Sequence, residues 1–400
     1  MSRSQVGRGA NGSGSIRKIE RITNGKKYVY YQARYTSGYD PGTGKQIQRS
    51  ICGKSKKEVM QKLRQVTTDI DSGTYTEPCD LTVGEWLDIW LTTYLQNVKP
   101  RTIESYEMNI RLHLKPGLGA VKLQVLNAPQ VQNFYNELAK PHGKNPALSA
   151  KTIHCIHGIL HKALKKAIQI GYIRNNPTEV CELPRKERKE ITPMEPEQIS
   201  EFLRRIRGHE FEDVYVVTMF TGLRRGEVAA LTWDCVDFDT STIYINKQLQ
   251  KIVGHPREFE LVSTKNGKAR IVSVAPSVMG RLRRLQREQA FQRLKMGPEW
   301  HNTNFVFCNE VGNHFSPNTI YNEFKKIVIE MGLPKLRFHD LRHSYAVAAL
   351  TAGDDIKTVQ ANLGHATATF TLDVYGHVTD QMRRASASRM ETFYQSVSNG

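Results

Sequence analysis

The sequence predicts a multidomain fold: a small α+β N-terminal domain with a three-stranded sheet and one helix, an all-α domain, and a mainly α C-terminal domain with a small antiparallel sheet. Three observations predict this division. At roughly 100–200 residues per domain, a chain of 400 residues corresponds to two to four domains. The net charge of +18 at pH 7 is uneven, at +9 over residues 1–78, +6 over 79–190 and +3 over 191–400. Turn-rich and charge-rich sequences at 73–80 and 184–190 are typical of linkers.

We therefore expect a flexible tail at 1–14, a sheet domain at 15–75, a helical domain at 80–180, a linker at 181–193 and a C-terminal domain at 194–400 that ends in a helix. With 39% hydrophobic and 24% charged residues the chain can bury cores, which excludes global disorder, a collagen-like fibre and a small disulfide scaffold.

The composition also indicates where the protein works and what it binds. No apolar run approaches the ~18 residues of a membrane span, and the first fifteen residues lack the apolar region of a secretory signal. Six cysteines without a CxxC pair fit the reduced thiols of the cytoplasm. The excess of positive charge is larger than solubility requires, so we expect a soluble, non-exported protein with a polyanionic partner, nucleic acid before membrane.

The first domain has the pattern of strands followed by a helix. β-branched and aromatic residues predict strands at 15–22, 27–36 and 46–52, with an Asn-Gly turn between the first two. Ser55 is placed to cap a helix that runs to about Asp71. On the middle strand one face carries Val29, Tyr31, Ala33 and Tyr35, and the other carries Tyr28, Tyr30, Gln32 and Arg34.

One of these two faces must pack against the helix. The second face mixes hydrogen-bond donors with aromatic rings, and a β-ribbon fits into a DNA groove. Tyr30, Gln32 and Arg34 are therefore candidate DNA-contact residues, with ordinary packing as the alternative for the tyrosine.

The next domain reads as entirely helical. Thr82 with Glu85 three residues later predicts a capping box, and further helices are expected at 102–114, 127–138 and 149–170. His154, His157 and His161 on the last helix have a spacing that could touch a metal. Because no carboxylate or thiol is organised around them, we interpret them as a solvated or phosphate-facing stripe.

The last region carries polar residues in an unusual order. An apolar helix is expected at 214–220, and it leads into Thr-Gly-Leu-Arg-Arg-Gly-Glu at 221–227. Strands are expected further on, at 242–252, 260–263 and 270–274, with a hairpin tip at 264–268. A helix begins at Ser316-Pro317 and ends near Gly332. His339 and Arg342 are three apart, on one face if this segment is helical.

The ordered set resembles the signature of the tyrosine recombinase (phage integrase) family. The matching residues are Arg224 in TGLRRGE, Lys265 in the expected hairpin, His339 and Arg342 in HDLRH, His365 in LGHA and Tyr375 in LDVYGH. The resemblance covers the whole C-terminal region, with Lys268 as the alternative to Lys265. The basic sheet and the helical part resemble the arm-binding and SAM-like core-binding domains of integrases from temperate phages and conjugative transposons. His343 and His377 match no family position and are interpreted as packing residues.

The chemistry of a phosphodiester explains why such residues occur together. Two guanidiniums, Arg224 and Arg342, can clamp the oxygens on which charge grows during the reaction. A tyrosine with a pKa near ~10 attacks well only if cations and a base favour its phenolate. The resemblance implies that Tyr375 forms a 3′-phosphotyrosine, that Lys265 protonates the leaving 5′-hydroxyl, that His339 assists proton transfer and that His365 hydrogen-bonds the phosphate. Glu227 would support the site, and neither a metal nor a cofactor is required.

The resemblance implies a site-specific recombinase that integrates and excises a mobile element through a Holliday junction. It would act as a homotetramer on core-type and arm-type sites of double-stranded DNA in the bacterial cytoplasm, with an excisionase or a host DNA-bending protein as candidate partners. The alternatives are a type IB topoisomerase-like enzyme, a catalytically inactive DNA-binding regulator, and a membrane-surface binder, for which an amphipathic helix is missing. The helix expected at 379–397 packs either on its own domain or on a neighbouring subunit.

Overall fold

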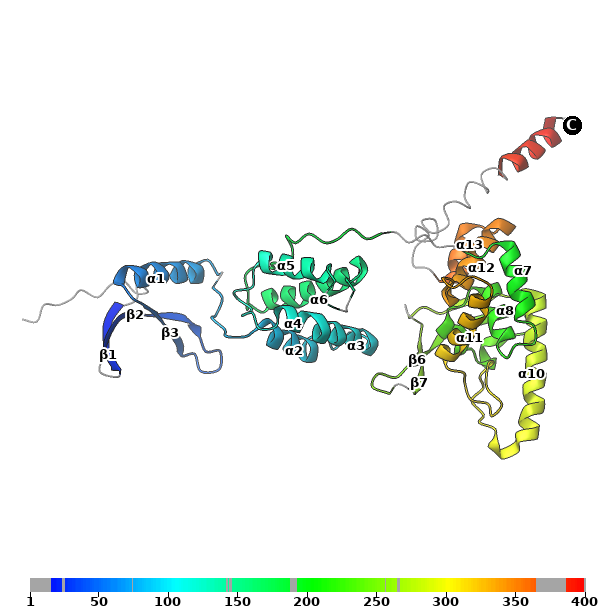
Figure 1. Cartoon of the computed structure of the whole chain (residues 1–400), viewed down its shortest axis with the longest axis horizontal. Coiled ribbons are helices and arrows are strands. Elements are labelled where there is room, and N and C mark those ends of the chain that lie inside the picture. Colours follow the sequence, from blue (N-terminus) through cyan, green and yellow to red (C-terminus); the bar gives the residue numbers. More distant parts are fainter. Residues whose placement is uncertain are drawn as a thin grey trace, which may run out of the picture. The chain divides into compact units, whose positions relative to one another are not determined.

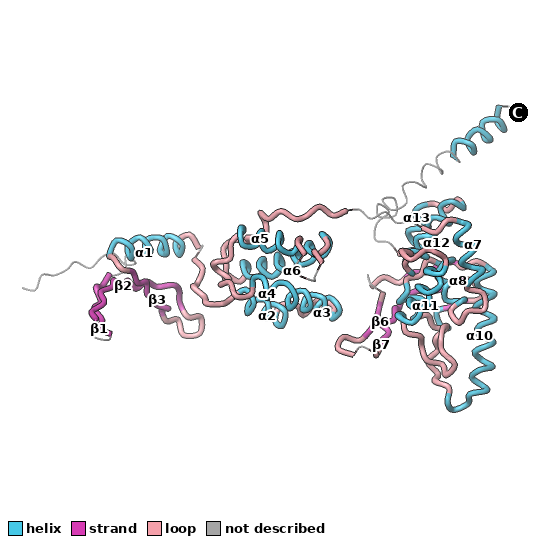
Figure 2. The backbone as a smooth tube through the Cα atoms, in the orientation of Figure 1, coloured by secondary structure: helices cyan, strands magenta, loops and turns pink. Residues whose placement is uncertain are grey.

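The computed structural model of the chain describes residues 16–23, 26–73, 75–141, 143, 146–187, 193–255, 257–264, 267–364 and 386–398. The chain forms two compact units, Met1–Glu187 and Arg188–Gly400 (Figure 1). Figure 2 shows that strands begin the first unit and that both units are otherwise rich in helix. The tail expected at 1–14 and residues 188–192 of the expected linker lie outside the described residues.

The first unit begins with an antiparallel sheet in the order β1-β2-β3, formed by Ile16–Thr23, Lys26–Tyr39 and Gln46–Gly53. Helix α1, Lys56–Asp71, covers one face, and the Ser55 side chain accepts from the Glu58 N–H to cap it. The small core contains Ala33, Tyr35, Val59 and Leu63, so the face of β2 that carries Ala33 and Tyr35 is the one that packs against the helix.

Val29 departs from that pattern, because it is 41% exposed although it shares the register of Ala33. It lies four residues from Ala33 toward the β1–β2 turn, ~13 Å along the strand, beyond the cluster of side chains that α1 covers.

The helical part of the first unit follows the predicted boundaries closely. Its helices are α2 Val83–Thr93, α3 Pro100–Asn109, α4 Lys115–Leu118, α5 Ala128–Leu138 and α6 Ala150–Gln169. The capping box of Thr82 and Glu85 is present. A π-helical turn, Ile110–Leu114, joins α3 to α4 just before Pro116, which has no N–H to donate to a helix. The indole N–H of the buried Trp86 donates to the Ala163 carbonyl at 3.0 Å, which fixes α2 against α6.

The histidines of α6 are not the solvated stripe that the sequence suggested. Nε2 of His154 lies 3.0 Å from the Pro184 carbonyl, and Nδ1 of His161 lies 2.9 Å from the Thr178 hydroxyl. Nδ1 of His157 lies 3.1 Å from the Tyr135 hydroxyl. Each half-buried imidazole therefore has a partner inside the protein, and two of them fasten the segment after α6. Among the described residues, no group of His, Cys, Asp or Glu has the arrangement of a metal site.

The second unit is a helical body with short strands. The helices are α7 Pro196–Arg205, α8 Glu212–Thr221, α9 Arg225–Ala229, α10 Pro276–Met296, α11 Pro317–Glu330, α12 Phe338–Ala352 and α13 Ile356–Leu363. The apolar α8 is buried at its centre, where Tyr215 packs among the rings of Phe202, Phe211, Phe324 and Phe338. This core orients α9 and α12, which carry the residues discussed below.

The strands of this unit correct one prediction. They are β4 Val236–Asp237, β5 Thr242–Ile245, β6 Lys247–Lys251, β7 Phe259–Ser263 and β8 Arg270–Ser273. Because β7 pairs with β6 and β8 pairs with β5, the chain reverses at 252–258, and the hairpin tip predicted at 264–268 is wrong. Thr264 and residues 267–269, the described part of this segment, lie between β7 and β8, which pair with different strands. Turn-forming residues predict a loop but not the pairing of the strands around it.

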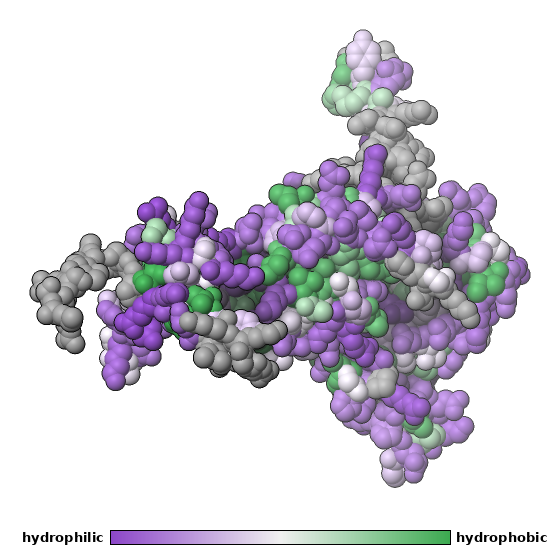
Figure 3. Space-filling model, turned by 60° about the vertical axis from the view of Figure 1, so that its left-hand side comes forward, coloured by the Kyte–Doolittle hydropathy of each residue, from purple (hydrophilic) through white to green (hydrophobic). Residues whose placement is uncertain are grey.

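The chain ends in a helix over residues 386–398, which confirms that part of the predicted C-terminal helix; residues 379–385 lie outside the described residues. Its side chains Met390, Phe393, Tyr394 and Val397 are exposed. Elsewhere the face seen in Figure 3 is mostly hydrophilic. None of the helices in the described ranges has both the length and the apolar composition of a membrane span.

Candidate active site

Arg224 stands at the start of the short helix α9, where a tight turn aims it. Gly222 ends α8 with a φ of +66°, and a Cβ there would lie 2.7 Å from the Tyr345 ring and 2.8 Å from Leu363. Only glycine fits both the left-handed backbone and the close contact. The turn places Arg224 at the N-cap of α9 with its side chain 24% exposed, so that its guanidinium is reachable from solvent.

Glu227 lies beneath Arg224 and is only 2% exposed. Its carboxylate accepts from the Arg224 backbone N–H at 2.8 Å and from Arg224 Nη1 at 2.7 Å. Burial acts to raise the pKa of Glu227, but hydrogen bonds and charge from Arg270, and the charge of Arg224, outweigh it and hold the pKa at about 2. The carboxylate is therefore ionised at neutral pH and holds both the backbone and the side chain of Arg224.

Arg270 is a member of this group that sequence reasoning missed. From β8 it donates Nη1 and Nη2 to the two Glu227 oxygens at 3.0 and 2.7 Å, and Nε to the Asn362 carbonyl at 2.7 Å. Its side chain is 9% exposed. One signal was available in the sequence: Arg270 shares a strand face with the fully buried Val272, and an arginine on a buried face needs an internal anion.

Helix α12 supplies His339 and Arg342, as their spacing predicted. Arg342 is 1% exposed, and its guanidinium donates to the carbonyls of Gly222, at 2.7 Å, and Leu363. The pKa of His339 is lowered to about 4, first by burial and then by the nearby charges of His343, Arg342 and Arg224. His339 is therefore neutral at pH 7. His343, interpreted from the sequence as a packing residue, is buried with its ring centroid 4.9 Å from that of His339.

The two candidate phosphate-binding arginines meet at one turn. Arg342 donates to the carbonyl of Leu363, and Arg224 Nη2 lies 3.4 Å from the carbonyl of the next residue, Gly364. Gly364 has a φ of +61° and ends α13 directly before His365. The structure thus brings together Arg224, Glu227, His339 and Arg342, which the sequence spreads over more than one hundred residues.

The structure does not describe every predicted site residue. Lys265, His365 and Tyr375 lie outside the described residues. Lys268 is described, and its carbonyl accepts from the Thr264 hydroxyl at 2.8 Å. Tyr30, Gln32 and Arg34 belong to the first unit, where Arg34 is exposed and the other two are half-buried on β2.

The charge of this group suits an anion. The guanidiniums of Arg224 and Arg270 bind the Glu227 carboxylate, and a third guanidinium, that of Arg342, donates to the Gly222 carbonyl. Guanidiniums bind planar pairs of oxygens and stay charged at any physiological pH, so the surplus favours a phosphodiester. A neutral imidazole beside them can exchange a proton during a reaction.

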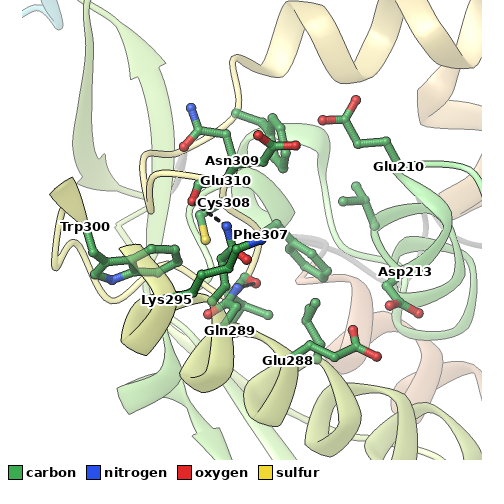
Figure 4. A pocket seen from close by; sticks show the side chains of 15 residues that line it. Glu210, Asp213, Glu288, Gln289, Lys295, Trp300, Phe307, Cys308, Asn309 and Glu310 are labelled. Atoms are coloured by element: carbon green, nitrogen blue, oxygen red, sulfur yellow. Dashed lines mark hydrogen bonds between the residues drawn. The ribbon is translucent and has the colours of Figure 1, made fainter. Parts of the chain in front are cut away.

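A cavity elsewhere in the second unit does not serve this purpose. It has a volume of about 500 Å³ and lies between α10, the start of α8 and the loop before α11 (Figure 4). Its lining includes the carboxylates Glu210, Asp213, Glu288 and Glu310 but none of the residues gathered around Glu227. Four carboxylates repel a phosphate, so the arginine-rich group and not this cavity is the candidate active site.

Sequence comparisons find relatives along most of the chain. The phage integrase family matches residues 189–382, and the N-terminal SAM-like domain of phage integrases matches residues 82–139. A "tyrosine recombinase XerC-like" protein of Caldanaerobacter subterraneus subsp. tengcongensis is 27% identical over 398 residues, which is 94% of this chain and 99% of the relative.

Two solved structures share the fold. The integrase of the Tn1549 transposon, in complex with a circular intermediate DNA, has a TM-score of 0.65 and 24% identity over 78% of this chain and 99% of that chain. A lambda integrase tetramer bound to a Holliday junction gives a TM-score of 0.55 and 18% identity, over 88% of this chain and 96% of that chain. The predicted fold class is therefore confirmed.

Proposed function

Because the chain belongs to the phage integrase family of tyrosine recombinases, we propose that Arg224 and Arg342 bind a scissile DNA phosphate that Tyr375 attacks. The protein is a site-specific recombinase, and on this proposal it breaks and rejoins the DNA of a mobile element. The observation that carries the assignment is the meeting of both guanidiniums at the consecutive carbonyls of Leu363 and Gly364.

The two arginines would act together on the non-bridging oxygens. Arg224 is oriented by Glu227, and its second amino group makes only a long 3.4 Å contact, which a phosphate oxygen can replace. Arg342 is fixed in a buried position before the substrate arrives. Donors that need no rearrangement stabilise the charge that develops in the transition state more than they stabilise the ground state.

The proposed step exchanges one phosphate ester for another. The Tyr375 oxygen forms a bond to phosphorus while the bond to the 5′ oxygen breaks. His339, neutral at pH 7, takes part in removing the phenolic proton, and Lys265, or Lys268 in its place, gives a proton to the leaving 5′ oxygen. His365 hydrogen-bonds the phosphate. The phosphotyrosine retains the ester, so that attack by a 5′-hydroxyl from another strand rejoins DNA without ATP.

Strand exchange requires more than one subunit. We propose a homotetramer that cleaves one strand of each of two duplexes, passes through a Holliday junction and then exchanges the other strands; the lambda integrase structure contains such a tetramer on a junction. The exposed apolar side chains of the helix at 386–398 would pack on a neighbouring subunit. The core site would be bound by two domains, residues 80–180 and residues 194–400, which a linker at 181–193 connects.

The basic sheet would hold a second DNA site. We propose that residues 15–75 bind arm-type DNA with Tyr30, Gln32 and Arg34, on the face of β2 opposite α1. An excisionase or a host DNA-bending protein would join the complex to set its direction. The reaction would take place on the bacterial nucleoid in the cytoplasm.

The test is a covalent adduct. The substrate is a duplex that spans the joined ends of the excised element. The sequence of this junction is obtained by PCR with primers that point outward from the two ends of the element, starting from the DNA beside the gene. A nick in the duplex traps the cleaved state. The wild-type protein should yield an adduct stable in SDS, and Tyr375→Phe should bind the duplex equally and yield none. An adduct that persists in Tyr375→Phe rules out this nucleophile. Relaxation of supercoiled DNA without products that join two sites would favour a topoisomerase. DNA binding without any covalent adduct would favour a catalytically inactive regulator.

A further inference from the structure

Arg225, at the start of helix α9, has surroundings unlike those of Arg224 and Arg270. Arg225 directly follows Arg224 and is half-buried, and its guanidinium carbon lies 5.3 Å from the centre of the Tyr321 ring. Tyr321 is in the second turn of α11, which begins after the Ser316 cap. A ring at this distance attracts the cation and holds it in one orientation.

The charges around Arg225 do not balance. Arg224 and Arg270 share Glu227, and Arg337 pairs with Asp340 at 2.7 Å. No carboxylate of the described residues forms an ion pair with Arg225. Burial lowers the pKa of Arg225, and the charge interaction with Tyr321 acts in the opposite direction. Arg225 is therefore a cation that has lost part of its hydration without gaining an anion from the described part of the chain.

Such an arrangement is unfavourable in the free protein and becomes favourable when an anion arrives. The guanidinium carbon of Arg225 lies over the Tyr321 ring, and the N–H donors of a guanidinium lie in the plane of the group, at its edge. Successive Cα atoms are ~3.8 Å apart, so an anion that Arg225 binds lies close to the anion that Arg224 binds.

We propose that Arg225, held by Tyr321, binds a second DNA backbone phosphate next to the phosphate that Arg224 and Arg342 bind. This inference rests on the proposed function, because it takes the scissile phosphate as its reference point. The second contact would set the register of the strand so that the correct phosphate reaches Tyr375. Arg225 is a binding residue in this proposal and takes no part in bond making.

The first measurement is the salt dependence of binding. Full-length wild-type protein, Arg225→Ala and Arg225→Lys are titrated with the duplex described above over a range of salt concentrations. Each phosphate contact contributes about 0.9 to the slope of log affinity against log salt, so Arg225→Ala should lower the slope by about one. Arg225→Lys should keep the slope, and Arg287→Ala, which removes an exposed arginine of α10, should leave it unchanged.

The second measurement identifies the phosphate. Duplexes carry a single neutral methylphosphonate at each position within three nucleotides of the cleaved bond. A methylphosphonate at one flanking position should weaken the binding of wild-type protein about tenfold. The same substitution should not further weaken the binding of Arg225→Ala. The proposal is overturned if, at every position, the losses of binding free energy from the methylphosphonate and from Arg225→Ala add up. It is also overturned if folded Arg225→Ala keeps the salt slope of the wild type.

Two controls separate this result from misfolding and from failure of the proposed function. Tyr321→Phe keeps the ring and should bind as wild type, whereas Tyr321→Leu removes it and should weaken binding at the same flanking position. Equal thermal unfolding midpoints establish that the variants are folded. If wild-type protein forms no adduct, the proposed function fails, whereas an adduct together with an additive methylphosphonate scan overturns only the Arg225 contact.

Discussion

Arg270 donates two hydrogen bonds to Glu227, at 3.0 and 2.7 Å, and the same carboxylate binds the backbone and side chain of Arg224. A residue of the sheet thus positions the arginine of α9 through a shared buried anion. Through Asn362, Arg270 also reaches the end of α13, directly before the turn that leads to His365. Arg270 is therefore a positioning residue that connects three separate segments of the chain.

Arg270→Ala should destabilise the protein and impair its geometry. Removing one partner leaves the Glu227 charge buried with fewer donors, and breaking such a pair lowers the free energy of unfolding by about 3–5 kcal/mol. Denaturant titration measures this loss. Arg270→Lys should lose less stability but still reduce adduct formation, because a single ammonium cannot hold both carboxylate oxygens. Wild-type adduct rates in a folded Arg270→Lys variant would contradict the positioning role.

The stability of the second unit should fall in acid because of Glu227. Its pKa is about 2 in the folded protein against an ordinary value of 4.5, so the carboxylate stabilises the fold above pH 4.5. This contribution is lost as the pH falls from about 4.5 toward 2. In Glu227→Gln the free energy of unfolding, measured by denaturant titration across this range, should be lower at pH 7 and change less with pH. A steeper acid dependence in the variant would contradict the assigned pKa direction.

His343, which is buried, and the adjacent His339 should change the stability over a different pH range. Burial lowers the pKa values of His339 and His343 to about 4 from 6.5, so both are neutral when folded and charged when unfolded between these values. Stability is complete above pH 6.5 and falls as the pH drops toward 4, by up to about 1.4 kcal/mol per pH unit for the buried His343. The exposed His339 contributes less, because solvent screens its charge. His339→Gln should flatten the dependence between pH 6.5 and 4 without altering the limb assigned to Glu227.

How much of this could be read from the sequence depends on the range of the interaction. The helix starts at Ser55, Thr82 and Ser316 were predictable because a capping side chain and the backbone N–H from which it accepts are close in the chain. The spacing of His339 and Arg342 gave their common helix for the same reason. By contrast, the pairing of β8 with β5 and the contact of Arg270 with Glu227 join segments 25 to 43 residues apart, and no local pattern encodes them.

The turn at Gly222 gives a prediction with a matched control. Gly208 also has a left-handed φ, at +77°, but a Cβ there meets nothing within 4 Å, whereas at Gly222 it meets the Tyr345 ring at 2.7 Å. Gly208→Ala should lose about 1–2 kcal/mol from backbone strain alone. Gly222→Ala should lose more and also slow adduct formation, since relief of the clash displaces Arg224. Equal effects of the two substitutions on unfolding and on the adduct rate would contradict this account.

The basic sheet offers a comparison between two arginines on adjacent strands. Arg34 is exposed on the face of β2 that lies opposite α1, whereas Arg49 is opposite Tyr35 in the register, on the helix side, and pairs with Glu77. If the face of Arg34 binds arm-type DNA, Arg34→Ala should lower the salt slope of binding to a duplex from the end of the element by about one. Arg49→Ala should leave that slope unchanged, because its charge is already paired. Neither substitution should alter the Tyr375 adduct on core DNA, since both lie outside the unit that carries Arg224 and Arg342. An equal loss of slope in the two variants would mean that the sheet binds DNA by overall charge and not through one face of β2.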